Sequence, residues 1–122
     1  MPMRIPSSTA VLIDAVACFA GAVLLFAIPQ IWDWTDLSGD WREPVAWALL
    51  LFSILLILAF RTGSRLLLAL AVIGNIAWIV AGAIALTHTG TLLGGVIIAL
   101  VMIGDAAMAW FQSRGIQRAN PS

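Results

Sequence analysis

The sequence predicts an all-α membrane protein, a bundle of four transmembrane helices with antiparallel neighbours, on three observations. Four apolar runs are each long enough to cross a hydrocarbon core of roughly 30 Å as a helix. Only 10% of the 122 residues are charged, whereas a soluble domain of this size carries about 25%. The arginines gather in segments that four spans would place on one side of a membrane. At this length, residues 1–122 are expected to form one transmembrane domain.

The four spans are predicted at residues 9–28, 45–61, 66–86 and 92–111. The first contains one charge, Asp14, and is long for the apolar core of a signal peptide. Because three more apolar runs follow it, a retained span is favoured. Pro44 suits the first turn of the second helix, which ends at Arg61.

The one long connection, residues 29–44, is acidic and rich in tryptophan. Trp32, Trp34 and Trp41 suit the membrane–water interface, where the ring is half buried and the N–H stays wet. Trp110 suits the opposite interface in the same way. We therefore expect loop 29–44 to lie along one membrane face as an interfacial cap. A loop that binds a ligand or partner is the alternative.

The placement of charge predicts the orientation. Five arginines fall on the side of the termini: Arg4, Arg61, Arg65, Arg114 and Arg118. Arg42 alone lies in loop 29–44, among four acidic residues. The positive-inside rule then predicts that both termini are cytoplasmic and that the loop faces out. Zero net charge and dispersed arginines argue against a nucleic-acid partner, so the lipid bilayer is the expected surrounding.

Packing between the helices is expected to depend on small residues. In lipid, helices associate through close contact of small side chains and through interhelical hydrogen bonds. Small residues recur at four-residue spacing on the first, third and fourth spans, whereas the second is rich in Leu and Ile. We therefore expect the first, third and fourth spans to form the tight core and the second to face lipid.

Three polar side chains lie inside the predicted spans: Asp14, Asn75 and Asp105. At about 1.5 Å per residue they lie roughly 9, 15 and 13 Å from Ser8, Arg65 and Arg114, which flank the terminal-side ends of their spans. Trp78 lies one turn from Asn75 on the same face. If these faces converge, the four residues form a candidate intramembrane site that opens toward the cytoplasm. A hydrogen-bond network that only holds the bundle together is the alternative.

The two intramembrane acids need compensation, because no basic residue lies inside any predicted span. A charged Asp at mid-bilayer costs about 2.5–3.5 kcal/mol on insertion scales. Either one carboxyl keeps its proton, or Arg61 or Arg65 reaches in from the turn between the second and third spans. A carboxyl that keeps its proton inside a membrane suits proton-coupled transport.

The sequence lacks the motifs of common enzyme active sites. It contains no Ser–His–Asp set, phosphate-binding loop or Cys-x-x-Cys motif. His88 is a lone histidine in a turn, and metal sites need several converging ligands. Cys18 has no partner for a disulfide and is expected to pack as a small apolar residue. We therefore expect no catalytic activity, no metal and no cofactor.

Three runs carry a resemblance: LIDAVACFAGAVLLFAIP, LLLALAVIGNIAWIVAGAIAL and LLGGVIIALVMIGDAAMAWFQSRGIQR. An early Asp, an Asn-x-x-Trp and a basic tail after the fourth span resemble those of small four-span bacterial integral membrane proteins of uncharacterised function. This resemblance implies the fold and an inner (cytoplasmic) membrane location, and no activity. The small multidrug-resistance transporters are also similar in having four short helices and an acid in the first. They carry Glu there, whereas this chain has Asp14, a second acid at Asp105 and no Tyr.

Two functions stay open. The first is a non-catalytic membrane bundle that acts through protein partners or self-association, as a small subunit or a homo-oligomer. The alternative is a proton-linked carrier or binder of a small cationic or amphipathic molecule that uses Asp14 and Asp105. The first is favoured because a chain of 122 residues has little room for an alternating-access pathway unless it dimerises.

Overall fold

The computed structural model describes the backbone of residues 7–119 and the side chains of residues 9–114. Within this range the chain is all-helical, without strands. Its long helices are α1 (Ser7–Ala27), α3 (Arg42–Thr62), α4 (Arg65–Leu86) and α5 (Leu92–Ala119), and the short ones are α2 (Gln30–Asp33) and the 3-10 helix η1 (Gly39–Trp41). All four long helices are long and apolar enough to cross a membrane, as predicted.

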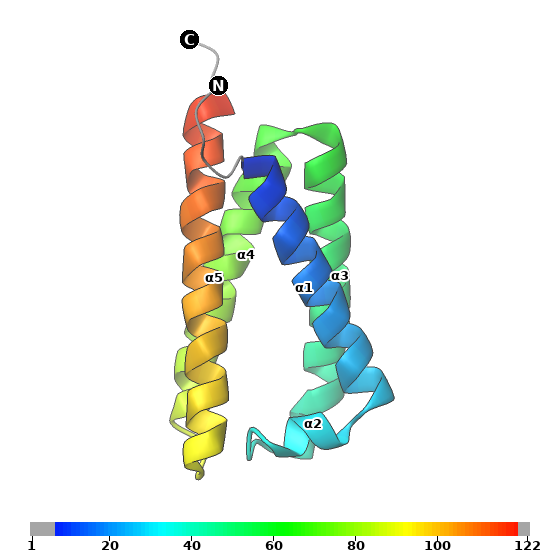
Figure 1. Ribbon diagram of the computed structural model, residues 1–122, viewed down its shortest axis with the longest axis vertical. Helices are drawn as coiled ribbons and strands as arrows, with labels where there is room; N and C mark the ends of the chain where they lie inside the picture. The colour runs from blue at the N-terminus through cyan, green and yellow to red at the C-terminus, as the bar shows by residue number, and fades with distance from the viewer. Residues whose placement is uncertain (1–6, 120–122) are drawn as a thin grey trace.

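The four long helices form two antiparallel pairs (Figure 1). α1 lies against α3 and α4 lies against α5, with fewer contacts between the two pairs. The start of α1, the end of α5 and the α3–α4 turn lie together at what we call the terminal end. The segment with α2 and η1 and the α4–α5 turn lie at the opposite end, the loop end. The two pairs approach each other at the terminal end and diverge toward the loop end.

Local chemistry sets the sharp turn between α3 and α4. Gly63 ends α3 with φ 66°, a left-handed conformation that a side chain would strain, and its N–H donates to the Ala59 carbonyl at 3.0 Å. Ser64 then caps α4, because its hydroxyl accepts from the N–H of Leu67 at 3.3 Å. The turn is therefore short, and α3 and α4 must run antiparallel.

Two helix boundaries differ from the predicted ones. α3 begins at Arg42, so Pro44 lies within its first turn and the connection after α1 is shorter than 29–44. α5 continues to Ala119, beyond the predicted end at residue 111. The apolar run ends there but the helix does not, because Gln, Arg and Ala are good helix formers and sustain the backbone hydrogen bonds in polar surroundings.

α3 is not the lipid-facing helix that its Leu and Ile content predicted. Its side chains Phe52 and Leu56 pack into one core cluster with Val11 and Ala15 of α1. Of the α3 span, 28% is buried inside the protein, against 11% for α4 and 11% for α5. The small side chains of α1, including the fully buried Ala22, admit the large side chains of α3. Small residues on one helix therefore pack against large residues on its neighbour.

Trp32 is not the exposed interfacial anchor that the sequence predicted. It is 7% exposed and packs against Leu25 in a second cluster at the loop end. Its indole N–H donates to the Ser38 carbonyl at 2.9 Å, which satisfies the polar atom of the buried ring. Trp34 and Trp41 remain exposed, at 56% and 62%. The connection between α1 and α3 thus buries one tryptophan in its own core and leaves two exposed.

This connection also contacts the turn between α4 and α5. The Thr89 hydroxyl donates to the Thr35 carbonyl at 2.7 Å, and the N–H of Gly90 donates to Asp36 Oδ2 at 2.9 Å. We call these four residues the loop latch. A Cβ at Gly94 would overlap the Thr35 carbonyl, so the close approach requires glycine there. The latch ties the α4–α5 pair to the α1–α3 pair at the loop end.

The arginines that determined the predicted orientation divide between the two ends. The described ones at the terminal end are Arg61, Arg65 and Arg114. Arg114 lies over the Trp110 ring at 5.6 Å, and Trp110 is itself 60% exposed. Arg42, at the loop end, donates to a main-chain carbonyl of α1 at 2.9 Å. Arg4 lies outside the described residues, as does the side chain of Arg118.

Candidate functional site

Three polar side chains meet where the two helix pairs touch, toward the terminal end. Asp14 Oδ2 accepts from Asn75 Nδ2 and from Gln112 Nε2, each at 2.8 Å. Asn75 Nδ2 also donates to Gln112 Oε1 at 3.0 Å. The residues are 4%, 0% and 0% exposed, and they come from α1, α4 and α5 respectively. We call Asp14, Asn75 and Gln112 the polar triad.

Asp14 has hydrogen-bond donors around both of its oxygens. Besides the two amide donors on Oδ2, the Cys18 thiol donates to Oδ1 at 3.6 Å. In these contacts Asp14 only accepts. The predicted contact between Asp14 and Asn75 is present, and it is part of a network that joins three helices.

Gln112 is the member that the sequence analysis missed. Depth on the fourth span was counted from Arg114 as its end, which placed Asp105 level with the other polar residues. Because α5 continues to Ala119, Gln112 lies at that level instead. The seven-residue spacing from Asp105 could have indicated Gln112, because residues at this spacing share a face of a helix.

Asp105 lies outside the triad. It is two turns from Gln112, about 10 Å along α5 toward the loop end. Its Oδ2 is buried and has no hydrogen-bond partner. Asp105 shares the face of α5 that carries Gln112, which is the face that contacts Asp14 of α1. The two acids of the predicted site thus lie on facing sides of α1 and α5, and the hydrogen-bond network described here includes Asp14.

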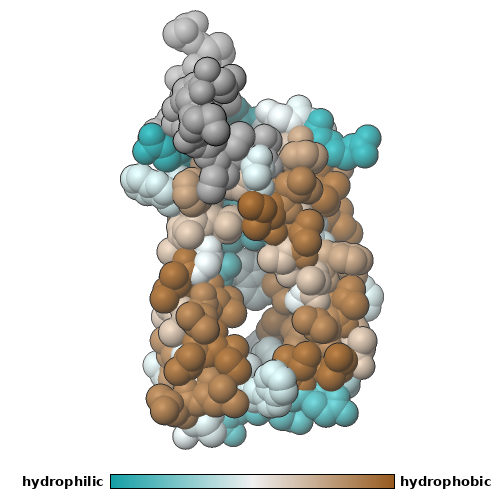
Figure 2. All heavy atoms as spheres, in the orientation of Figure 1, coloured by the Kyte–Doolittle hydropathy of each residue, from teal (hydrophilic) through white to brown (hydrophobic). Residues whose placement is uncertain are grey.

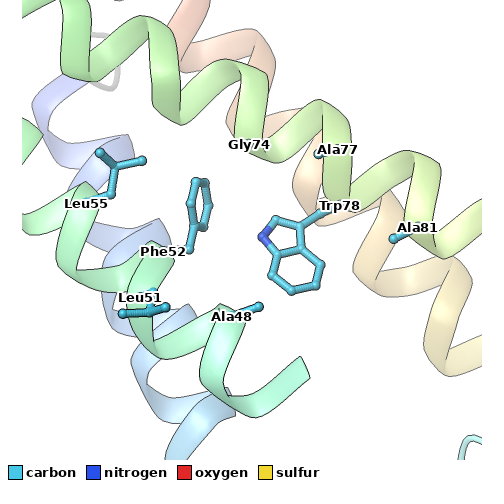
Figure 3. Close-up of a pocket in the computed structure, with 8 residues that line it drawn as sticks. All are labelled: Ala48, Leu51, Phe52, Leu55, Gly74, Ala77, Trp78 and Ala81. Atoms are coloured by element: carbon cyan, nitrogen blue, oxygen red, sulfur yellow. The ribbon is translucent and has the colours of Figure 1, made fainter. Parts of the chain in front are cut away.

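Between the triad and the loop latch the two helix pairs do not close on each other. On the α3–α4 face there is a groove of about 490 Å³, whose walls include Ala48, Phe52, Gly74, Ala77, Trp78 and Ala81. Figure 3 shows Trp78 of α4 and Phe52 of α3 projecting into the space between these helices. Figure 2 shows an opening that runs through the molecule between the α1–α3 half and the α4–α5 half. We call the α3–α4 groove the passage.

Trp78 belongs to the passage and not to the triad. Its ring is partly buried against the cluster that contains Phe52 and Leu56. A carbon-rich wall of this kind binds hydrocarbon and offers little to water or to a polar substrate. The predicted four-residue site therefore divides into a structural network at Asp14 and Asn75 and a passage that Trp78 lines, with Asp105 between α5 and α1.

Other chemistry is sparse. Within the described part of the chain, no three His, Cys, Asp or Glu side chains converge to hold a metal ion. No protein-family model, curated protein or solved structure matches the chain. The fold and the site together define a class: a helical bundle with four helices able to cross a membrane, a buried polar network and an apolar passage between its halves.

Proposed function

We propose that this chain is a non-catalytic multi-pass membrane protein that binds the hydrocarbon part of an amphipathic small molecule in its passage. The observation that carries the proposal is the passage itself, an apolar groove between α3 and α4. Atoms that line a void lose dispersion contacts, and apolar walls do not hold ordered water. A hydrocarbon chain restores those contacts, so it is the occupant that such walls favour.

The distribution of charge supports the membrane and the orientation that accompany this proposal. Arg61, Arg65 and Arg114 lie at the terminal end, whereas the connection at the loop end carries Asp33, Asp36 and Asp40. By the positive-inside rule the terminal end is cytoplasmic, in a cytoplasmic (inner) membrane. The groove would then open sideways to lipid, which is the direction from which an amphipathic molecule arrives.

Action through protein partners or self-association is the second candidate. Gly74, Ala77 and Ala81 line the α4 side of the groove, and small residues at such spacing admit a neighbouring helix closely. In this case a helix of a partner or of a second copy would fill the α3–α4 groove. The two proposals predict different occupants of the same surface, so one experiment separates them.

The test uses Trp78 as a native reporter of the passage. The protein is reconstituted in phosphatidylcholine nanodiscs and titrated with 11-bromo-1-undecanol, whose bromine quenches tryptophan fluorescence on contact. Subtracting the signal of a Trp78→Phe variant isolates the reporter from the other tryptophans. We expect saturable quenching of Trp78, because a binding site fills whereas contact with bulk lipid does not.

A blocking variant and its matched control decide the outcome. Ala81→Phe places a ring in the groove, and Ala83→Phe places the same ring on an exposed position of α4 outside the groove lining. Binding is expected to be lost in the first and kept in the second. Quenching that never saturates would overturn the proposal. Loss of a dimer or larger assembly in Ala81→Phe, measured by mass photometry, would favour the partner proposal instead.

A further inference from the structure

We propose that the outer face of α5 binds an anionic phospholipid, with the phosphate group at Arg114 and the acyl chains along the apolar side chains that precede it. This inference goes beyond the proposed function, because it concerns the surface of α5 and not the groove between α3 and α4. It shares with the proposed function only the placement of the long helices in a membrane. Three observations carry it: the exposure of Arg114 and Trp110, the order of side chains along this face, and the distribution of charge.

The buried side of α5 identifies its outer face. Gln112 is 0% exposed and donates to Asp14 of α1, so its side of the helix faces the bundle. An α-helix turns by about 100° per residue, so Trp110 and Arg114 each lie about 160° from Gln112 and about 40° from each other. Both side chains are exposed, Trp110 at 60%. They therefore point away from the bundle together.

Arg114 and Trp110 offer hydrogen-bond donors on this face. The Arg114 guanidinium lies over the Trp110 ring at 5.6 Å, a cation–π contact that orients it before a ligand binds. A guanidinium and an indole N–H donate and do not accept, and a phosphate group accepts. Among the described residues the ion pair is that of Arg42 with Glu43, at the loop end. Arg114 is therefore free of any described acid and suits a phosphate.

The order of side chains along this face matches the order of groups in a phospholipid. Before Trp110 the outer face carries apolar side chains at helical spacing, each 47–65% exposed: Leu93, Val96, Leu100 and Ile103. Arg114 follows Leu93 by 21 residues, or about 31 Å, close to the roughly 30 Å of a hydrocarbon core. Acyl chains would lie along the apolar part, the ester groups would lie beside Trp110 at the interface, and the phosphate would lie at Arg114.

The placement of acidic residues favours an anionic head group over a zwitterionic one. Four of the six acids fall in residues 33–43, at the loop end. Asp14 is 4% exposed in the triad, and Asp105 lies on the bundle side of α5. The outer face therefore has no acid to pair with the cation of a zwitterionic lipid. Arg61 and Arg65 are exposed at the same end as Arg114 and add to the attraction of negative charge.

The experiment is native mass spectrometry of the full chain in a nonionic detergent with equimolar dioleoylphosphatidylglycerol and dioleoylphosphatidylcholine. These lipids share their acyl chains, so the ratio of their complexes with the protein reports the preference for the head group. We expect the wild type to favour phosphatidylglycerol. Arg114→Gln is expected to lower this preference about tenfold, because a charge-assisted hydrogen bond to the phosphate is lost.

Two control variants locate the site. Arg65→Gln removes the same charge from an exposed position at the same end, but from α4, so it is expected to change the preference less than about twofold. Ala81→Phe fills the groove between α3 and α4 and is expected to leave the preference unchanged. Since Arg114 is exposed, Arg114→Gln is expected to unfold at the temperature of the wild type.

The outcomes separate this inference from the proposed function. Equal binding of the two lipids by the wild type would overturn it, as would equal losses of preference in Arg65→Gln and Arg114→Gln, which would indicate general attraction to positive charge. Loss of the preference in Ala81→Phe would place the lipid in the groove and overturn the site on α5. If Trp78 quenching never saturates but Arg114→Gln alone loses the preference, the proposed function fails and the site on α5 stands.

Discussion

Replacing Gln112 by Leu tests whether the polar triad holds the two helix pairs together. Gln112 takes part in two of the three hydrogen bonds, donating to Asp14 and accepting from Asn75. Leu is of similar size, so the space stays filled and the loss is mainly that of the two bonds. Interhelical hydrogen bonds in membrane proteins average about 0.6 kcal/mol and reach about 1.7. We therefore expect the free energy of unfolding to fall by about 1–3 kcal/mol.

The assay is reversible unfolding in mixed micelles, titrated with a denaturing detergent and followed by circular dichroism. Ser113→Ala is the matched control, because Ser113 is the next residue and its hydroxyl donates to the Trp110 carbonyl within the same helix. Its effect is expected to stay within about 0.5 kcal/mol. If Gln112→Leu is as stable as Ser113→Ala, the triad does not hold the pairs together and the reasoning is refuted.

Two further predictions concern the loop end. Gly94→Ala brings a methyl group onto the Thr35 carbonyl, so it is expected to lower the free energy of unfolding by about 1–3 kcal/mol and to speed hydrogen exchange in the latch. Gly95→Ala is the control, because nothing lies within 4 Å of its new Cβ. It is expected to leave the stability unchanged or to raise it slightly. Equal stability of these two variants in the micelle titration would contradict the latch. Trp32→Phe is expected to cost about 1 kcal/mol because it loses the indole hydrogen bond, whereas the exposed Trp34→Phe stays within about 0.5 kcal/mol. Thermal unfolding checks this pair, and equal shifts would show that Trp32 is not buried as described.

The four long helices were predictable because each contains an apolar run that is long enough to cross a membrane and holds at most one acidic residue. The contact between Asp14 and Asn75 was also within reach, because both residues lie a short and countable distance from the same end of their helices. Polar residues in apolar runs are few, so their positions constrain how the helices face one another.

The features that were not predicted depend on information that composition does not carry. Gln112 was assigned to a polar tail, because hydropathy marks where an apolar run ends and not where the helix ends. α3 was expected to face lipid, because small residues were counted on each helix separately, although the large side chains of α3 pack against the small ones of α1. Trp32 became buried through the path of the connection around it, which tryptophan preference alone does not predict.

The polar triad also has a consequence for how the protein is made. Its hydrogen bonds join Asp14 to partners 61 and 98 positions later in the chain. During synthesis into the proposed membrane, α1 therefore enters with an aspartate whose amide donors do not yet exist, at a cost of up to about 3 kcal/mol. Asn75 supplies one donor with α4, and Gln112 supplies the other only near the end of α5. Biogenesis of the bundle is thus completed by its last helix, and a nascent chain halted before residue 112 carries an incompletely paired acid.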